Sequence, residues 1–163
     1  MSDSVVNAVN VTATLAHNDL VARGIGRFSL ALLFKGSVSP RAREIVILRM
    51  GWNCQSIYEF GQHTLFGRDA GLTDAEIYWV TRPVIEHDWS DEDRGLIEMV
   101  DDLYVDDCVS DATWAELAER FSTADILEFM AAALQYRVVS GLLNSCGVER
   151  DEGVPGWPSA PTG

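Results

Sequence analysis

Apolar residues recur at spacings of three and four along most of the chain, whereas alternating, strand-like runs are scarce. This pattern predicts an all-α protein. Near the start we expect two helices, over residues 11–23 and 26–34, separated by a break near Gly24. The next helix is expected after Ser39, because Pro40 is suited to the first helical position, and it continues to Met50.

Caps and breaks predict the elements that follow. The run 51–53 interrupts the helical pattern, and Asn53 is a suitable cap for a helix over residues 54–70 that Gly71 ends. Later helices are expected after serine or threonine caps, several of which have an acidic residue three positions on: Thr73 (to about Thr81), Ser90, Ser110, and Ser122 or Thr123. We find no internal repeat, and one domain over residues 1–150 is expected.

The last predicted helix is apolar almost all round between residues 124 and 144. Such a helix needs neighbours on several sides, so we expect a homo-oligomer whose interface uses it. The alternative is the central helix of a monomeric bundle. From residue 151 onward the chain is rich in Gly and Pro without periodicity, which predicts a flexible C-terminal tail or one draped over a neighbour.

Composition narrows the classes of partner. The 163 residues are 47% hydrophobic and carry 12 basic and 25 acidic side chains, a formal net charge of −13. This charge argues against non-specific binding to nucleic acid or to an anionic membrane surface. We also expect no membrane-spanning run and no basic leader. The three cysteines form no CxxC motif, which favours a reducing compartment, so a cytoplasmic location is expected.

Glu59 and His63 are the first candidates for chemistry. Their i,i+4 spacing on one predicted helix brings the carboxylate beside the imidazole, which is a workable acid/base pair. The large apolar residues around them favour a partly buried pair. The alternative is an ion pair with a purely structural role.

Glu44 is the second candidate, because it precedes an almost wholly apolar run. It either faces the Glu59–His63 pair across a helix contact or pairs with Arg41 or Arg43 at the helix start. Two carboxylates and one imidazole would also suit a divalent metal, but no second histidine is placed to join them, so no metal is expected.

Three segments resemble the carboxymuconolactone decarboxylase family, whose fold is shared with the alkylhydroperoxidase D (AhpD) proteins. They are Arg43-Glu44-Ile45-Val46-Ile47-Leu48-Arg49, Tyr58-Glu59-Phe60-Gly61-Gln62-His63 and Ala70-Gly71-Leu72-Thr73-Asp74-Ala75-Glu76-Ile77. The resemblance extends over about residues 10–148. It implies an AhpD-like, all-α helical bundle that is oligomeric.

The resemblance also separates two branches of the family. The peroxidase branch uses a glutamate and a CxxC whose second cysteine lies four residues before a histidine. Anchored on His63, the cysteine positions are occupied by Ser56 and Glu59, and the glutamate is Glu44. A dithiol cycle needs both sulfurs, so the sequence is similar to the branch without the CxxC.

The function implied is cofactor-free acid/base chemistry, either decarboxylation or another proton transfer, on a small unsaturated carboxylate, lactone or carbonyl compound. We expect His63, Glu59 and Glu44 to be catalytic, and Tyr58, Arg49 and Trp52 to bind substrate, with the arginine meeting a substrate carboxylate. Two alternatives stay open. One is a non-catalytic protein that shares the fold, and the other is a single-thiol redox protein that uses Cys54, which lies near a predicted helix start.

Overall fold

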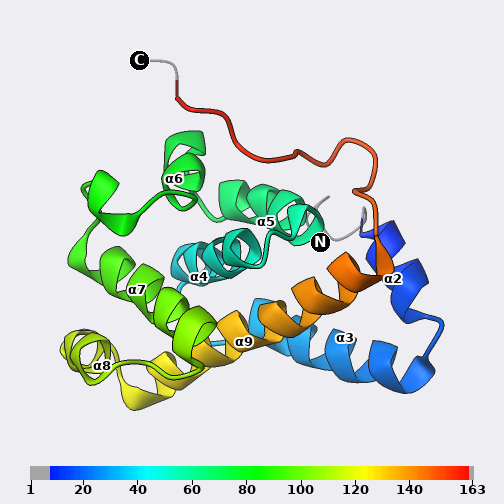
Figure 1. Ribbon diagram of the computed structural model, residues 1–163. Coiled ribbons are helices and arrows are strands. Elements are labelled where there is room, and N and C mark those ends of the chain that lie inside the picture. The colour runs from blue at the N-terminus through cyan, green and yellow to red at the C-terminus, as the bar shows by residue number, and fades with distance from the viewer. Residues whose placement is uncertain (1–7, 162–163) are drawn as a thin grey trace.

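The computed structural model describes residues 8–161, and within that range it consists of helices and connecting loops (Figure 1). In chain order the elements are α2 (Val9–Leu15), α3 (Asp19–Phe34), α4 (Pro40–Asn53), α5 (Ile57–Asp69), α6 (Asp74–Trp79), the 3-10 turn η1 (Val84–Glu86), α7 (Asp91–Asp106), α8 (Asp111–Ala118) and α9 (Thr123–Cys146). The all-α prediction is confirmed.

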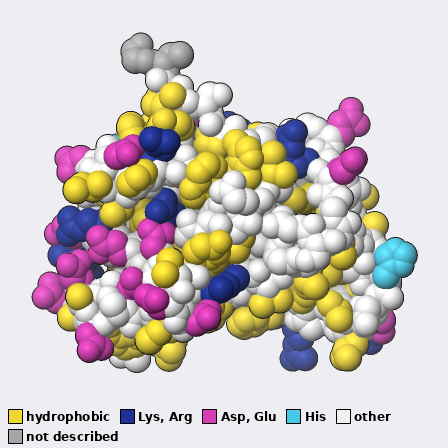
Figure 2. All heavy atoms as spheres, in the orientation of Figure 1, with side chains coloured by type: hydrophobic (Ala, Val, Ile, Leu, Met, Phe, Trp, Pro, Cys, Tyr) yellow, Lys and Arg dark blue, Asp and Glu magenta, His cyan; other side chains and the backbone are white. Residues whose placement is uncertain are grey.

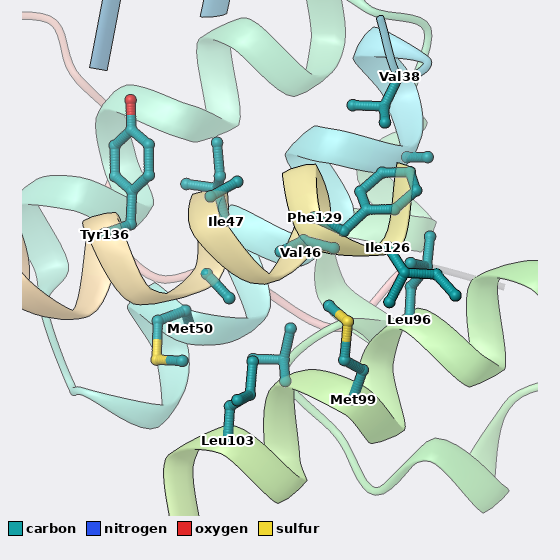
Figure 3. Close-up of a cluster of buried hydrophobic side chains, with 14 of the residues drawn as sticks. Val38, Val46, Ile47, Met50, Leu96, Met99, Leu103, Ile126, Phe129 and Tyr136 are labelled. Carbon is teal, nitrogen blue, oxygen red and sulfur yellow. The ribbon is translucent and has the colours of Figure 1, made fainter. Parts of the chain in front are cut away.

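Helix α4 lies at the centre of the bundle. Every residue from 42 to 51 is buried, and the helix packs against α5, α7 and α9. Ala42, Val46 and Met50 face the main core, which α7 and α9 complete with Leu96, Met99, Leu103, Ile126 and Phe129 (Figure 3). Ile45 and Leu48 face a second core with Phe60 of α5. Because α4 is enclosed, its charged residues must find partners inside the protein.

Helix α9 runs the length of the molecule, from α8 at one end to α2 and α3 at the other (Figure 1). By length and composition it could cross a membrane, which the sequence-based expectation of no membrane-spanning run missed. In the fold, however, it packs against α3, α4, α5, α7 and α8 as a core helix of the bundle. Leu127, Leu134 and Val138 remain exposed on its outer side.

The first two helices divide at a different place from the predicted one. Gly24 lies inside α3, and the chain breaks instead at residues 16–18, where the Asn18 side chain accepts a hydrogen bond from the Val21 amide. Glycine within a helix costs only about 1 kcal/mol relative to alanine, and a capped start with Asp19 in the first turn offsets this cost.

The connection between α4 and α5 also differs from the expectation. Asn53 does not cap α5; it ends α4, and its amide donates to Asp101 of α7. A three-residue turn, 54–56, follows, in which Gln55 has a left-handed backbone (φ 52°) and Ser56 directly precedes α5. This tight turn sets α4 and α5 side by side, and the pair carries the site described below.

The four later helix starts agree with the capping patterns. Thr73 and Ser122 form capping boxes, and the Ser90 and Ser110 hydroxyls each accept a backbone amide of the first turn. Gly147, with φ 63°, ends α9 in the left-handed conformation.

Residues 151–157 pack on the domain instead of leaving it as the expected flexible tail. Asp151 and Val154 are buried, and the Trp157 ring lies 5.1 Å from both Trp52 and Phe60 between ring centroids. The contact is close at Gly61 of α5, where an added Cβ would lie 2.3 Å from the Pro155 carbonyl oxygen. Gly and Pro here shape a segment that follows α5 rather than one without contacts (Figure 1).

The acidic side chains gather toward the side formed by α7 and α8, on the left in Figure 2. Both helices begin with acidic residues, which the N-terminal ends of helices favour. The negative charge therefore lies mainly away from α2 and α3, which cover the candidate site.

Candidate active site

The structure brings Glu44, Glu59 and His63 together in the interior. Glu44 comes from α4 and the other two from α5, and their relative exposures are 0%, 5% and 3%. His63 Nδ1 lies 2.6 Å from Glu44 Oε2, and His63 Nε2 lies 3.6 Å from Glu59 Oε2. The imidazole thus lies between two carboxylates.

Arg43 orients the Glu44 carboxylate of this arrangement. Its Nε and Nη2 donate to Glu44 Oε1 at 3.0 and 2.9 Å, and its Nη1 donates to the Leu33 carbonyl at 2.9 Å. Because Glu44 Oε1 accepts from the guanidinium, Oε2 is the acceptor for His63, and the tautomer that fits this contact carries its hydrogen on Nδ1 and donates it to Glu44. The Nε2 atom is then free to exchange a proton on the side of Glu59.

Both possibilities raised for Glu44 therefore hold at once, because it faces His63 and also pairs with Arg43. Arg41 is not its partner; that guanidinium binds Asp93 and Glu76.

Glu59 is the carboxyl group of the site with a perturbed acidity. Its pKa is raised above the usual value. Burial is the largest cause, and the negative charge of Glu44 adds to it, while His63 acts in the opposite direction. At 3.6 Å the Glu59–Nε2 distance is longer than a hydrogen bond. The Glu59 carboxyl therefore faces His63 Nε2 without a direct hydrogen bond, and its raised pKa favours the form of Glu59 that holds a proton.

Tyr136 of α9 completes the arrangement, and sequence reasoning did not single it out as a site residue. Its ring meets the His63 ring edge-on, with centroids 4.4 Å apart. Burial, followed by the charges of Glu59 and Glu44, raises the pKa of its hydroxyl well above 10, so the hydroxyl keeps its proton. Figure 3 shows this hydroxyl pointing away from the core residue Met50.

A cavity of about 310 Å³ opens beside these groups. His63, Glu59 and Tyr136 line it, and most of the remaining wall comes from apolar residues of α2 and α3: Ala8, Val11, Leu15, Ala22, Ile25, Gly26, Leu30, Leu33 and Phe34. Phe66 and Val139 also contribute. Thr12, Ser29, Tyr58 and Gln62 add polar groups, so the acid/base groups lie in a mainly apolar cavity with a few polar side chains, which is the usual form of a small-molecule site.

Tyr58 lies at this cavity, as the expectation of a substrate-binding role requires, but its hydroxyl is engaged. It donates to Asp151 Oδ2 at 2.5 Å and accepts from the Val11 amide at 3.2 Å. Asp151 also accepts from Gln62 Nε2 at 2.8 Å and from the Asn10 amide at 2.9 Å. These bonds hold α2, which has no buried residue of its own, against α5.

Arg49 and Trp52, which were expected to bind substrate, do not line this cavity. Arg49 forms a bidentate salt bridge with Asp101, at 2.7 and 2.6 Å, and donates to the carbonyls of Val80 and Arg82. Trp52 packs against Trp157. Both residues lie on another face of α4, where they connect it to its neighbours.

The thiols lie apart from the acid/base groups. Cys54 follows the end of α4 rather than starting a helix, and its sulfur lies 3.7 Å from that of Met50. Burial raises the pKa of the Cys54 thiol, which disfavours the reactive thiolate. Over residues 8–161, no cluster of three or more His, Cys, Asp or Glu side chains has a geometry that would hold a metal ion.

Fold and site define a small all-helical protein with a buried carboxylate–imidazole–carboxyl arrangement beside an apolar cavity. The profile of the carboxymuconolactone decarboxylase family matches residues 19–89, a stretch that contains all three residues of that arrangement. The match covers less than half of the chain, so the chain is similar to this family over that stretch, and the solved structures described next show that it has the AhpD-like fold.

Two solved structures show the same fold. The first, an alkylhydroperoxidase AhpD core, is an uncharacterized peroxidase-related protein from Ralstonia eutropha JMP134. It has a TM-score of 0.80 at 20% identity, covering 88% of this chain and 77% of the other. The second, a protein of unknown function from Agrobacterium tumefaciens named for antioxidant defence and AhpD, has a TM-score of 0.73 at 15% identity, covering 78% and 88%. No curated protein matches the sequence significantly.

Proposed function

We propose that the protein catalyses cofactor-free proton transfer on a small molecule bound in the α2–α3–α5–α9 cavity. The observation that carries the proposal is the position of His63: Nδ1 is held by Glu44 at 2.6 Å, while the ring lines the cavity together with Glu59. A histidine with one nitrogen fixed and the other beside a second titrating group is arranged for general acid/base chemistry.

The proposed step moves two protons. The step starts with Glu59 protonated and His63 Nε2 without a hydrogen. Nε2 removes a proton from the substrate carbon next to a carbonyl, while the Glu59 carboxyl gives its proton to the carbonyl oxygen. Return of a proton from Nε2 to the same or a conjugated carbon, and of the enol proton to Glu59, restores the enzyme and gives exchange or isomerisation. Decarboxylation would instead use a proton on His63 Nε2 to protonate the carbon that loses carbon dioxide, and the ring would recover this proton from solvent.

Two features support this proposal over the alternatives. A structural ion pair has no need to line a cavity, yet both His63 and Glu59 do. Disulfide-based peroxide reduction needs two sulfurs, and the corresponding positions are Ser56 and Glu59. Helix α4 supplies Glu44 and Arg43, which would orient the ring without touching the substrate.

The test is hydrogen exchange in deuterated buffer, followed by proton NMR on a panel containing a small ketone, a lactone and an unsaturated acid. This readout registers exchange, isomerisation and loss of carbon dioxide alike. We expect His63→Asn to lower the rate by about 100-fold or more. The matched control is His17→Asn, which changes an exposed histidine.

Equal rates for His63→Asn and wild type would refute the proposal, as would the absence of any protein-dependent reaction across the panel. Circular dichroism of the variant establishes that it folds. If His63→Asn does not fold, Glu59→Gln serves as the second variant, with Glu98→Gln, a half-buried glutamate outside the cavity, as its control.

A further inference from the structure

The composition of the cavity wall leads to a second inference, which rests on the proposed function because it concerns the same cavity. No Lys or Arg is among the described residues that line it. Its walls from α2 and α3 are mainly aliphatic and aromatic, with hydroxyl groups from Thr12 and Ser29. Its ionisable groups are Glu59, His63, Tyr58 and Tyr136. The cavity therefore offers hydrogen bonds at one part and apolar contact elsewhere.

Arg43 is the guanidinium that contacts the acid/base groups, but it does not line the cavity, and each of its three nitrogens already donates to a protein acceptor. Two of its nitrogens bind Glu44 and the third binds the Leu33 carbonyl, in a side chain that is almost fully buried. Turning it toward the cavity would leave a buried carboxylate unpaired, which is strongly unfavourable. The positive charge that a carboxylate ligand needs is therefore already neutralised.

The remaining charges oppose an anion. A ligand carboxylate beside His63 would also face Glu59, with Glu44 directly behind the ring. The charge of Arg43 is balanced by Glu44, and the raised pKa of Glu59 favours its neutral form, so the site needs no charge from the ligand. A bound carboxylate would add an uncompensated negative charge in an apolar surrounding.

We infer that the ligand of this cavity is a neutral, mainly apolar molecule with one hydrogen-bonding oxygen, such as a ketone or a lactone, and that carboxylates are rejected. The volume of about 310 Å³ corresponds to about ten non-hydrogen atoms, taking ~30 Å³ per water molecule as the scale. Within the proposed function, this favours exchange or isomerisation over decarboxylation.

The experiment compares γ-octalactone with octanoate, because each has ten non-hydrogen atoms and only the second is charged. Binding to the full chain is measured at pH 7.5 by nitrogen–proton correlation NMR. We expect saturable binding of the lactone and a dissociation constant at least about tenfold weaker for octanoate. Octanoate binding as tight as the lactone, or binding of neither molecule, would overturn the inference.

Two glycines of α3 provide a matched pair of variants that locates the binding. An added Cβ meets nothing within 4 Å at either Gly24 or Gly26, but only Gly26 lines the cavity. Gly26→Leu should therefore fill the cavity and weaken lactone binding by about tenfold or more, while Gly24→Leu should leave it unchanged. Equal effects of the two variants would contradict binding in this cavity.

A charge variant tests the reason for rejecting carboxylates. Leu30 lies at the cavity and is half exposed, so Leu30→Lys places an ammonium group at the edge; Leu20→Lys, on the exposed side of the same helix, is the control. Leu30→Lys should tighten octanoate binding several-fold and Leu20→Lys should not. No change with Leu30→Lys would show that charge does not determine the selectivity.

These binding measurements fail independently of the exchange assay. Lactone binding with full exchange activity in His63→Asn would refute the proton-transfer proposal and keep the ligand class. Exchange that depends on His63 together with preferred binding of octanoate would keep proton transfer and refute the ligand class.

Discussion

Glu44→Gln should be among the most damaging single changes in this protein, although it replaces only one oxygen. Glu44 is fully buried, and its two oxygens receive Arg43 on one side and His63 on the other. The amide removes the negative charge and leaves the Arg43 guanidinium without a counter-ion in the interior. Breaking a buried ion pair in this way costs about 3–5 kcal/mol of unfolding free energy.

The substitution should also reverse the tautomer of His63. Arg43 needs an oxygen acceptor, so the amide group turns its NH₂ toward His63 Nδ1. That nitrogen must then accept, and the ring hydrogen moves to Nε2 on the side of Glu59. A base at Nε2 becomes a donor, and proton removal from a ligand should fall by about 100-fold or more.

Urea and thermal denaturation measure the loss of stability, and NMR of the ring nitrogens identifies the tautomer of His63. For a chain of this size, 3–5 kcal/mol corresponds to a loss of about 6–20 °C in melting temperature. Asp101→Asn is a matched control, since it removes the counter-ion of Arg49 at a carboxylate that is 34% exposed, and we expect a smaller loss. A Glu44→Gln protein within about 1 kcal/mol of wild type, with hydrogen still on Nδ1, would refute the reasoning.

Three further predictions concern acidity, thiol chemistry and assembly. Burial raises the pKa of Glu59 above its usual 4.5, so the folded state favours the protonated form. Relative to Glu59→Gln, wild type should therefore lose stability as the pH rises above about 4.5. A stability difference between the two proteins that is independent of pH in urea denaturation would contradict this. Cys54, with its pKa raised by burial, should react with iodoacetamide about tenfold or more slowly than exposed Cys108; turnover of an alkyl hydroperoxide that stops when Cys54 is blocked would show the opposite. If α9 forms a homo-oligomer interface, Leu134→Asp and Val138→Asp should lower the sedimentation coefficient, whereas a monomeric wild type at micromolar concentration would refute the interface.

Sequence alone could predict the parts of the site that depend on local geometry. Glu59 and His63 are four residues apart on one helix, so the helical repeat fixes their proximity. Glu44 stood out as a carboxylate inside an apolar run, but its contact with His63 depends on how α4 packs on α5. Tyr136 lies on α9, which is remote in sequence, and no spacing rule connects it to His63.

The errors have physical causes of the same kind. Arg49 was expected to meet a substrate carboxylate, but it follows Glu44 by five helical residues, which turns its side chain by about 140° from that of Glu44 and toward α7. Gly24 was expected to break a helix, yet the Asn18 cap decides where α3 begins. The tail was judged from its Gly and Pro content, whereas its position depends on Trp157 and Asp151 meeting α5.

The packed C-terminal segment has a practical consequence for work with this protein. Composition places a domain end at residue 150, and a chain shortened there would lose Asp151, the carboxylate that joins Tyr58 and Gln62 to the start of α2. Such a truncated protein would keep the main core, yet one wall of its cavity would be loosely attached. Inactivity of a shortened chain would then result from the loss of the contacts that hold α2 in place, not from the loss of a catalytic group. Peptide tags at this end should be placed beyond Trp157.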